Sequence, residues 1–121
     1  MGQNPRSQAG LSPRLLDAVV GYVDQNIASD LSLRELASIS GMSASYFRVL
    51  FKRALGISVH QYIMRRRIDH AMRLLSRRSI RLCQVALESG FTDQSHMARC
   101  MRRMIGITPA ALLKQFGNNA A

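Results

Sequence analysis

Residues 36–58 read LASISGMSASYFRVLFKRALGIS, and residues 85–108 read VALESGFTDQSHMARCMRRMIGIT. Both stretches have an alanine, a glycine four positions later, an apolar and basic segment, and a closing Gly-Ile followed by a hydroxyl residue. From Phe47 against Met97 the match runs without a gap, and only the turn of the second copy is one residue longer. Each copy therefore predicts a helix, a glycine turn and a second helix with a basic end.

A helix-turn-helix needs a small residue where its helices touch, a turn glycine that can take positive φ, and apolar anchors that dock the second helix. The residues that meet these needs are Ala37, Gly41, Phe47 and Leu50 in the first copy and Ala86, Gly90, Met97 and Cys100 in the second. Many helical hairpins share one such pattern. Its repetition, with a basic end in each copy, makes the prediction of two helix-turn-helix units specific.

Capping signals and apolar periodicity extend this prediction to the whole chain. The expected helix starts are Ser12-Pro13, Ser32 (with Glu35 as a capping box), Ser43, Ser58, Leu82, Thr92 or Asp93, and Thr108-Pro109, with the first helix ending near Ala28 and the last near Phe116. The fold class is all-α, with seven helices forming two helix-turn-helix subdomains joined by a long central helix. The expected division is a flexible leader or linker at 1–11, a domain at 12–116 (units 12–56 and 81–116, central helix 58–77) and a tail at 117–121.

Charge is concentrated in the part of the chain that holds the repeat. The chain has 121 residues and a net charge of +10; residues 43–121 hold fourteen Lys or Arg against three acidic residues, and residues 1–42 hold three against four. One alternative is that the excess positive charge only solvates the protein surface. Because the excess falls in and around the repeated units, it favours a polyanionic partner, double-stranded DNA.

The sequence offers no enzyme site. His60, His70 and His96 lack metal-ligand spacing, and there is no Ser-His-acid group or glycine-rich phosphate loop, so we expect no catalysis, metal or cofactor. Cys83 and Cys100 stand alone at apolar positions, which predicts buried reduced thiols as in a cytosolic protein. No apolar run approaches the ~20 residues that span a bilayer. We expect a soluble, cytoplasmic protein with no membrane partner.

If Phe47, Leu50 and Phe51 are buried, the opposite face of their helix is free to read bases. The predicted base-reading residues are Ser45, Arg48 and Val49 in the first copy and Gln94, Ser95 and Arg99 in the second: arginine suits guanine, Gln94 adenine, and Val49 a thymine methyl. The predicted backbone contacts are Lys52, Arg53 and Arg102, with Ser43 and Thr92 at helix N-termini that favour phosphate. Asp93 is expected to cap its helix.

The length of the central helix is suited to holding two recognition helices in adjacent major grooves. About 20 residues at 1.5 Å each span roughly 30 Å, and successive major-groove faces lie about 34–36 Å apart. One chain is thus expected to read two adjacent major-groove segments of an asymmetric site, with the DNA bent toward the protein.

The chain resembles the DNA-binding domain of the AraC/XylS family of bacterial transcription regulators. The resemblance covers residues 12–116 and rests on Leu36-Ala37 with Gly41-Met42-Ser43, Phe51-Lys52-Arg53 with Gly56, Tyr62-Ile63 with Arg67-Ile68, Ala71 and Leu74-Leu75, and Val85-Ala86 through Gly90-Phe91 to Gly106-Ile107-Thr108-Pro109. It implies promoter binding, often with activation through RNA polymerase, and it adds Tyr46 and His96 to the two recognition helices, where we assign them to the DNA backbone. Many members carry an upstream effector-binding or dimerisation domain, and residues 1–10 fit a linker from one.

The chain departs from the family in its second unit. Met97 and Met101 stand where the family usually has Phe, and Leu112 and Leu113 where it often has Tyr and Arg. The second unit is therefore expected to be more softly packed. Two alternatives stay open: a repair protein that joins such a domain to a reactive cysteine, and a non-specific binder of polyanions or membrane surfaces that uses the Arg-rich central helix.

Overall fold

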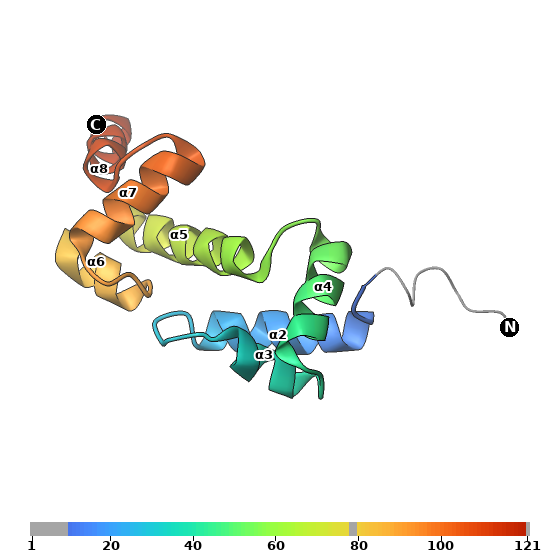
Figure 1. Cartoon of the computed structure of the whole chain (residues 1–121). Helices are drawn as coiled ribbons and strands as arrows, with labels where there is room; N and C mark the ends of the chain where they lie inside the picture. The colour runs from blue at the N-terminus through green and yellow to red at the C-terminus, as the bar shows by residue number, and fades with distance from the viewer. Residues whose placement is uncertain (1–9, 78–79, 121) are drawn as a thin grey trace, which may run out of the picture. The chain divides into compact units, whose positions relative to one another are not determined.

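The computed structural model describes residues 10–77 and 80–120, and over these residues the chain forms seven helices and no strand (Figure 1). The all-α fold class is confirmed. The helices are α2 (Pro13–Gln25), α3 (Leu33–Ile39), α4 (Ala44–Leu55), α5 (Val59–Arg77), α6 (Leu82–Glu88), α7 (Gln94–Ile105) and α8 (Pro109–Ala120).

The helices form two compact units, and α5 contributes to both. The first unit holds the described residues up to Asn26 together with Asp30–Ile63, and the second holds Ile27–Ser29 and the described residues from Met64 onward. The predicted leader lies mostly outside the described residues, but its end packs onto the first unit. Leu11 is buried, and a Cβ added to Gly10 would stand 2.7 Å from the backbone nitrogen of Ala54.

In the first unit, α3 contacts both α2 and α4. Phe47 and Phe51 of α4 are fully buried, and their ring centroids lie 5.8 Å apart. Phe51 also meets Tyr62 of α5 edge-on, at 5.6 Å. These aromatic contacts fix the rotation of α4 about its axis, and thereby decide which of its residues face outward.

Most helix starts follow the predicted capping residues, because each cap is a local side-chain bond to a backbone N–H that has no helical partner. Ser12, Ser32 and Ser43 accept from residues three positions on, at 3.3, 3.0 and 3.2 Å. The Ser58 hydroxyl accepts the Gln61 N–H at 3.1 Å, and the side-chain oxygen of Gln61 accepts the Ser58 N–H at 3.2 Å. At α3, the Glu35 carboxylate accepts the hydroxyl of Tyr22, which ties α3 to α2.

Two predicted helix ends were wrong. The first helix stops at Gln25 rather than Ala28, because Asn26 turns its side-chain amide onto the Tyr22 carbonyl, at 2.9 Å, and caps the helix. The last helix continues to Ala120 rather than ending near Phe116. A glycine inside a helix costs only about 1 kcal/mol, so Gly117 does not stop it.

The second unit has an aliphatic and methionine core. Its buried members are Met64, Ile68, Ala71, Leu74, Leu75, Val85, Ala86, Phe91, Met97, Met101 and Leu112. The apolar periodicity of the central helix predicts that its arginines, Arg67 among them, face outward, but Arg67 is half-buried here. It donates to the carbonyls of Ile27 and Ser29, at 3.1 and 2.8 Å, so this arginine holds a loop.

Three apolar positions of the second unit do not lie as predicted. Cys83 is exposed and Cys100 only half-buried, so neither is the fully buried thiol that the pattern indicated. Ile105 follows Met97 and Met101 at the same spacing of four residues, which predicts a buried side chain, but it is 43% exposed. Cys83 belongs to the first turn of a seven-residue helix, and Ile105 is the last residue of α7. Residues at such ends escape the burial that periodicity predicts for a helix interior.

Candidate nucleic-acid interface

The two turns of the repeat begin with similar backbone geometry. Gly41 and Gly90 have φ of +67° and +90°, a region open to glycine at little cost. The next residue's N–H returns to the alanine carbonyl in each copy: Met42 to Ala37 at 3.1 Å and Phe91 to Ala86 at 2.9 Å. The repeated sequence thus builds two turns that begin alike, although the second is one residue longer before its helix starts. Each turn leads into a second helix, α4 or α7, that packs against a buried core.

On α4, burial of Phe47, Leu50 and Phe51 leaves one continuous outward face. All seven residues predicted for the first unit are exposed on or beside it: Ser43, Ser45, Tyr46, Arg48, Val49, Lys52 and Arg53. The helix contains no acidic residue. Its surface is therefore cationic with an apolar strip, the character that phosphate and base contacts require.

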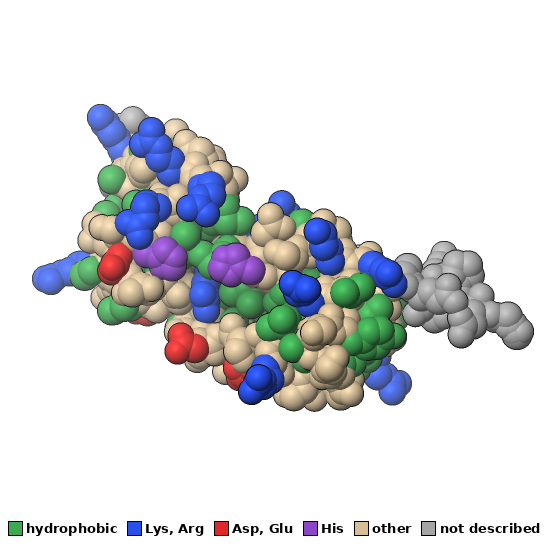
Figure 2. All heavy atoms as spheres, in the orientation of Figure 1, with side chains coloured by type: hydrophobic (Ala, Val, Ile, Leu, Met, Phe, Trp, Pro, Cys, Tyr) green, Lys and Arg blue, Asp and Glu red, His purple; other side chains and the backbone are tan. Residues whose placement is uncertain are grey.

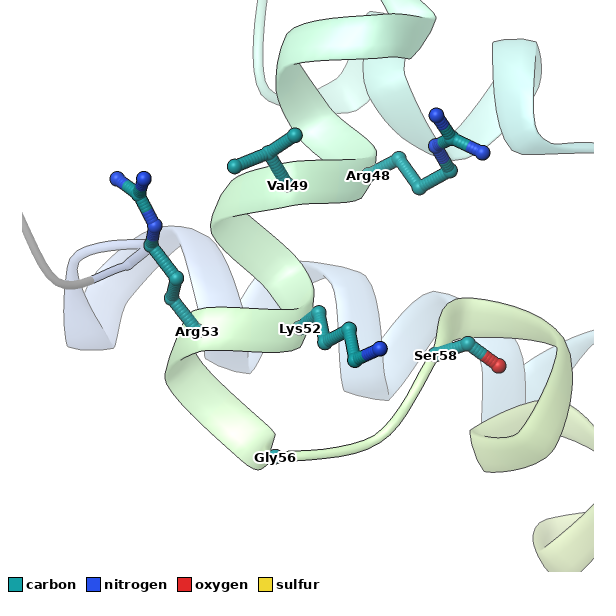
Figure 3. Close-up of a pocket in the computed structure, with 6 residues that line it drawn as sticks. All are labelled: Arg48, Val49, Lys52, Arg53, Gly56 and Ser58. Atoms are coloured by element: carbon teal, nitrogen blue, oxygen red, sulfur yellow. The ribbon is translucent and has the colours of Figure 1, made fainter.

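Four of these side chains line a common hollow of about 570 Å³: Arg48, Val49, Lys52 and Arg53, together with Gly56 and Ser58 (Figure 3). In the view of Figure 3, Arg48 and Lys52 extend toward the side of α4 on which Ser58 lies, and Arg53 extends to the other side. Val49 stands between the two arginines. The basic groups thus flank an apolar centre.

On α7, Met97 and Met101 are fully buried and take the anchoring positions of the aromatic residues of α4. The opposite face exposes the predicted residues Gln94, Ser95, Arg99 and Arg102. Asp93 caps the helix and accepts the N–H of His96 at 2.8 Å, as predicted. This helix also has no acidic residue between its first and last positions.

His96 is held in one orientation at the start of α7. Its ring meets the buried ring of Phe91 edge-on, at 5.4 Å, and its Nδ1 accepts the N–H of exposed Thr92 at 3.2 Å. With Nδ1 accepting, the proton of the neutral ring lies on Nε2. The backbone N–H groups of Thr92 and His96 are therefore already bonded within the protein, and the His96 Nε2–H is a side-chain donor that this end of α7 can offer to a phosphate.

Sequence reasoning left out one basic residue of this surface. Arg103 is exposed at the end of α7, at the position that the repeat pairs with Arg53. The repeat was the signal that identifies it, because the two copies align without a gap from Phe47 and Met97 onward.

The surface in Figure 2 shows Lys and Arg side chains, in blue, standing out repeatedly, with few Asp and Glu side chains in red.

Burial raises the pKa of the Cys100 thiol, although Arg103 and Arg99 act against this shift. A thiol with a raised pKa stays protonated near neutral pH, which opposes nucleophilic use of this cysteine.

Among the described residues, no helix combines the length and the apolar character needed to cross a lipid bilayer.

Comparison with known proteins points in one direction. A family model described as a helix-turn-helix domain matches residues 36–115. The probable transcriptional regulator LumQ of Photobacterium leiognathi is 39% identical over 88 residues, which make up 73% of this chain and 36% of LumQ. The virulence regulon transcriptional activator VirF of Yersinia enterocolitica is 33% identical over 89 residues, 74% of this chain and 33% of VirF. The chain therefore spans about a third of the length of these relatives.

Solved structures with the same fold include two DNA-binding proteins. A transcriptional regulator from Chromobacterium violaceum, described as AraC-type, superposes with a TM-score of 0.79 at 29% identity, over 93% of this chain and 96% of that one. The DNA-binding domain of the global transcriptional factor AdpA, solved in complex with a target DNA, gives a TM-score of 0.81 at 25% identity, over 89% and 96%.

Proposed function

This chain belongs to the AraC/XylS family of DNA-binding transcription regulators, and from that premise we propose that it recognises an asymmetric promoter site by placing α4 and α7 in adjacent major grooves. One observation carries the proposal. In each copy of the repeat the anchoring residues of the second helix are buried, namely Phe47, Leu50 and Phe51 of α4 and Met97 and Met101 of α7. The outward face that remains is rich in basic and polar side chains, and neither helix has an acidic residue.

Base selection is assigned to the centre of each outward face. Arg48 donates in bidentate fashion to a guanine edge and Val49 contacts a thymine methyl, with Ser45 beside them. On α7, Gln94 reads adenine and Arg99 guanine, with Ser95 as a further hydrogen-bonding group. Equivalent positions carry different side chains, Val49 against Arg99 for example, so the two segments of the site differ in sequence.

Phosphate contacts are assigned to the flanks and ends of the two helices. The residues are Ser43, Tyr46, Lys52 and Arg53 in the first unit and Thr92, His96, Arg102 and the newly identified Arg103 in the second. Such contacts set register and supply most of the salt-dependent affinity. For Thr92 the available donor is its hydroxyl, because its N–H is bonded to His96.

The length of α5 supports reading by a single chain. Its 19 residues span about 28 Å, somewhat less than the 34–36 Å between successive major-groove faces. A bend of the DNA toward the protein makes up the difference, at a cost that depends on the flexibility of the intervening base steps.

The wider role is proposed from the relatives. VirF is named as an activator, and we assign activation, with RNA polymerase as the partner, to this protein as well. Since the chain spans about a third of such relatives, an additional effector-binding or dimerisation domain fits the same scheme. The site of action is the cytoplasm, and neither catalysis nor a cofactor has a part in it.

Selection of binding sites from random duplexes tests the proposal directly. We expect a consensus of two segments one helical turn apart, and Arg48→Ala and Arg99→Ala should each relax preference in a different segment, at roughly 1–3 kcal/mol. Arg14→Ala is the matched control, because Arg14 is also an exposed arginine but lies on α2. Equal affinity for selected and random DNA at physiological salt would refute the proposal and favour a non-specific polyanion binder.

A further inference from the structure

Two large apolar side chains are exposed on the outward face of α4. Tyr46 is 58% and Val49 42% exposed. The equivalent positions of α7 hold His96 and Arg99, so the outward faces of the two helices differ in apolar character as well as in charge.

The two apolar side chains lie side by side. Residues three apart in a helix share a face, separated by about 60° around the axis. In Figure 3, Arg53 lies on one side of Val49 and Arg48 on the other. An apolar strip between cationic groups suits a polyanion that also presents apolar groups.

DNA presents such a group in the major groove. The C5-methyl of thymine is the apolar feature of a base edge there, and apolar side chains recognise it. Phosphates on either side of the groove would meet the basic flanks. The occupant that matches both the charge and the apolar strip is thus a thymine-containing duplex.

The geometry points to Tyr46 and Val49 as joint readers of two neighbouring thymine methyl groups in the segment bound by α4. This inference rests on the proposed function and deepens it, because it moves the ring of Tyr46 from the backbone to the bases. It also distinguishes the two segments of the DNA site by the kind of contact made in each. Thymine methyls select the α4 segment, and hydrogen bonds from Gln94 and Arg99 select the α7 segment.

Deoxyuridine replaces thymine with the loss of the methyl group alone, so it isolates this contact. In the selected duplex we expect a roughly fourfold rise in Kd for each contacted thymine replaced, from the burial of one methyl group. Those thymines should fall in the segment where Arg48→Ala relaxes base preference. Uracil in the segment that Arg99→Ala relaxes should change Kd by less than about twofold.

Protein variants assign each methyl to its side chain. Val49→Ala should abolish the uracil penalty at one thymine and Tyr46→Ala at the neighbouring one, whereas Tyr46→Phe should keep it. Leu87→Ala is the control, because Leu87 is 61% exposed on α6, outside this face. It should leave every penalty unchanged, and circular dichroism checks that all variants fold.

The outcomes separate the two claims. If selected and random DNA bind differently but no thymine of the α4 segment is sensitive to uracil, the thymine contacts of both Tyr46 and Val49 are wrong. The proposed sequence-specific binding through α4 and α7 then still stands. Loss of the penalty in Tyr46→Phe would assign the effect to the hydroxyl and overturn the role of the ring. If Tyr46→Ala and Val49→Ala bind every duplex with wild-type affinity, these side chains do not read DNA. The apolar strip is then a surface for another partner. Equal binding of selected and random DNA would refute both claims.

Discussion

Substitution of Gly90 tests how the second turn is built. Gly41 and Gly90 occupy equivalent places in the repeat and both have positive φ, but their surroundings differ. A Cβ on Gly41 meets nothing within 4 Å. A Cβ on Gly90 would stand 2.2 Å from the carbonyl oxygen of Ile27 and 2.5 Å from Nε of Arg67, so one of these groups must move.

The expected costs follow from these two environments. An alanine in the left-handed region costs about 1–2 kcal/mol, which is the whole of the expected effect of Gly41→Ala. Gly90→Ala adds the displacement of the loop that Arg67 holds through bonds of 3.1 and 2.8 Å. Loss of a hydrogen bond from a charged group costs about 1.5–3 kcal/mol. The total for Gly90→Ala is therefore about 2.5–5 kcal/mol.

Urea unfolding followed by circular dichroism measures both variants, with NMR amide signals reporting which unit is affected. We expect Gly90→Ala to lower the midpoint two to four times as much as Gly41→Ala, with the loss confined to the second unit. In an Arg67→Ala background the extra penalty of Gly90→Ala should shrink, because the loop is then free to move away. Equal penalties for the two glycines in the wild-type background would refute the reasoning.

Three further predictions concern single residues. Lys52→Ala should weaken all duplexes alike and lower the slope of log K against log salt by about one, measured by anisotropy titrations; a change in base preference would contradict a phosphate role. Burial lowers the pKa of His70, which lies 3.1 Å from the hydroxyl of Ser89. Below pH 6.5, the ordinary pKa of histidine, the unfolded chain therefore binds more protons at His70 than the folded chain does, so acidification favours unfolding. The melting temperature should fall as the pH is lowered below that value, and it should fall less in His70→Gln. Ser32→Ala should cost about 1 kcal/mol in urea unfolding through loss of its bond to the Glu35 N–H; no change would mean that the cap is redundant.

The candidate interface was largely predictable because it depends on the rotation of two helices. Once Phe47 and Met97 are recognised as anchors, a period of 3.6 residues decides which side chains face outward, and Arg48 and Arg99 are indeed exposed. That these residues contact DNA stays a prediction. The bonding of the Thr92 N–H to the ring of His96 was not foreseeable, because it depends on a rotamer that the buried ring of Phe91 supports.

The sequence by itself determined the features that arise within a few residues of each other. The helices that start at Ser12, Ser43 and Asp93 are capped by hydrogen bonds between residues three positions apart. The turns at Gly41 and Gly90 follow from backbone conformations that are open to glycine. Such interactions are encoded locally, so pattern and spacing are enough to find them.

Only the tertiary structure decided what happens between distant residues. Arg67 bonds a carbonyl 40 positions away, so nothing in the sequence of its own helix distinguishes it from Arg65 and Arg66 beside it. Glu35 completes a cap pattern in the sequence, yet its carboxylate also takes the Tyr22 hydroxyl. Cys83 and Ile105 are exposed because each lies at an end of its own helix, where packing against other segments no longer covers the side chain. These outcomes are set by packing between segments far apart in the chain, which periodicity along one helix does not report.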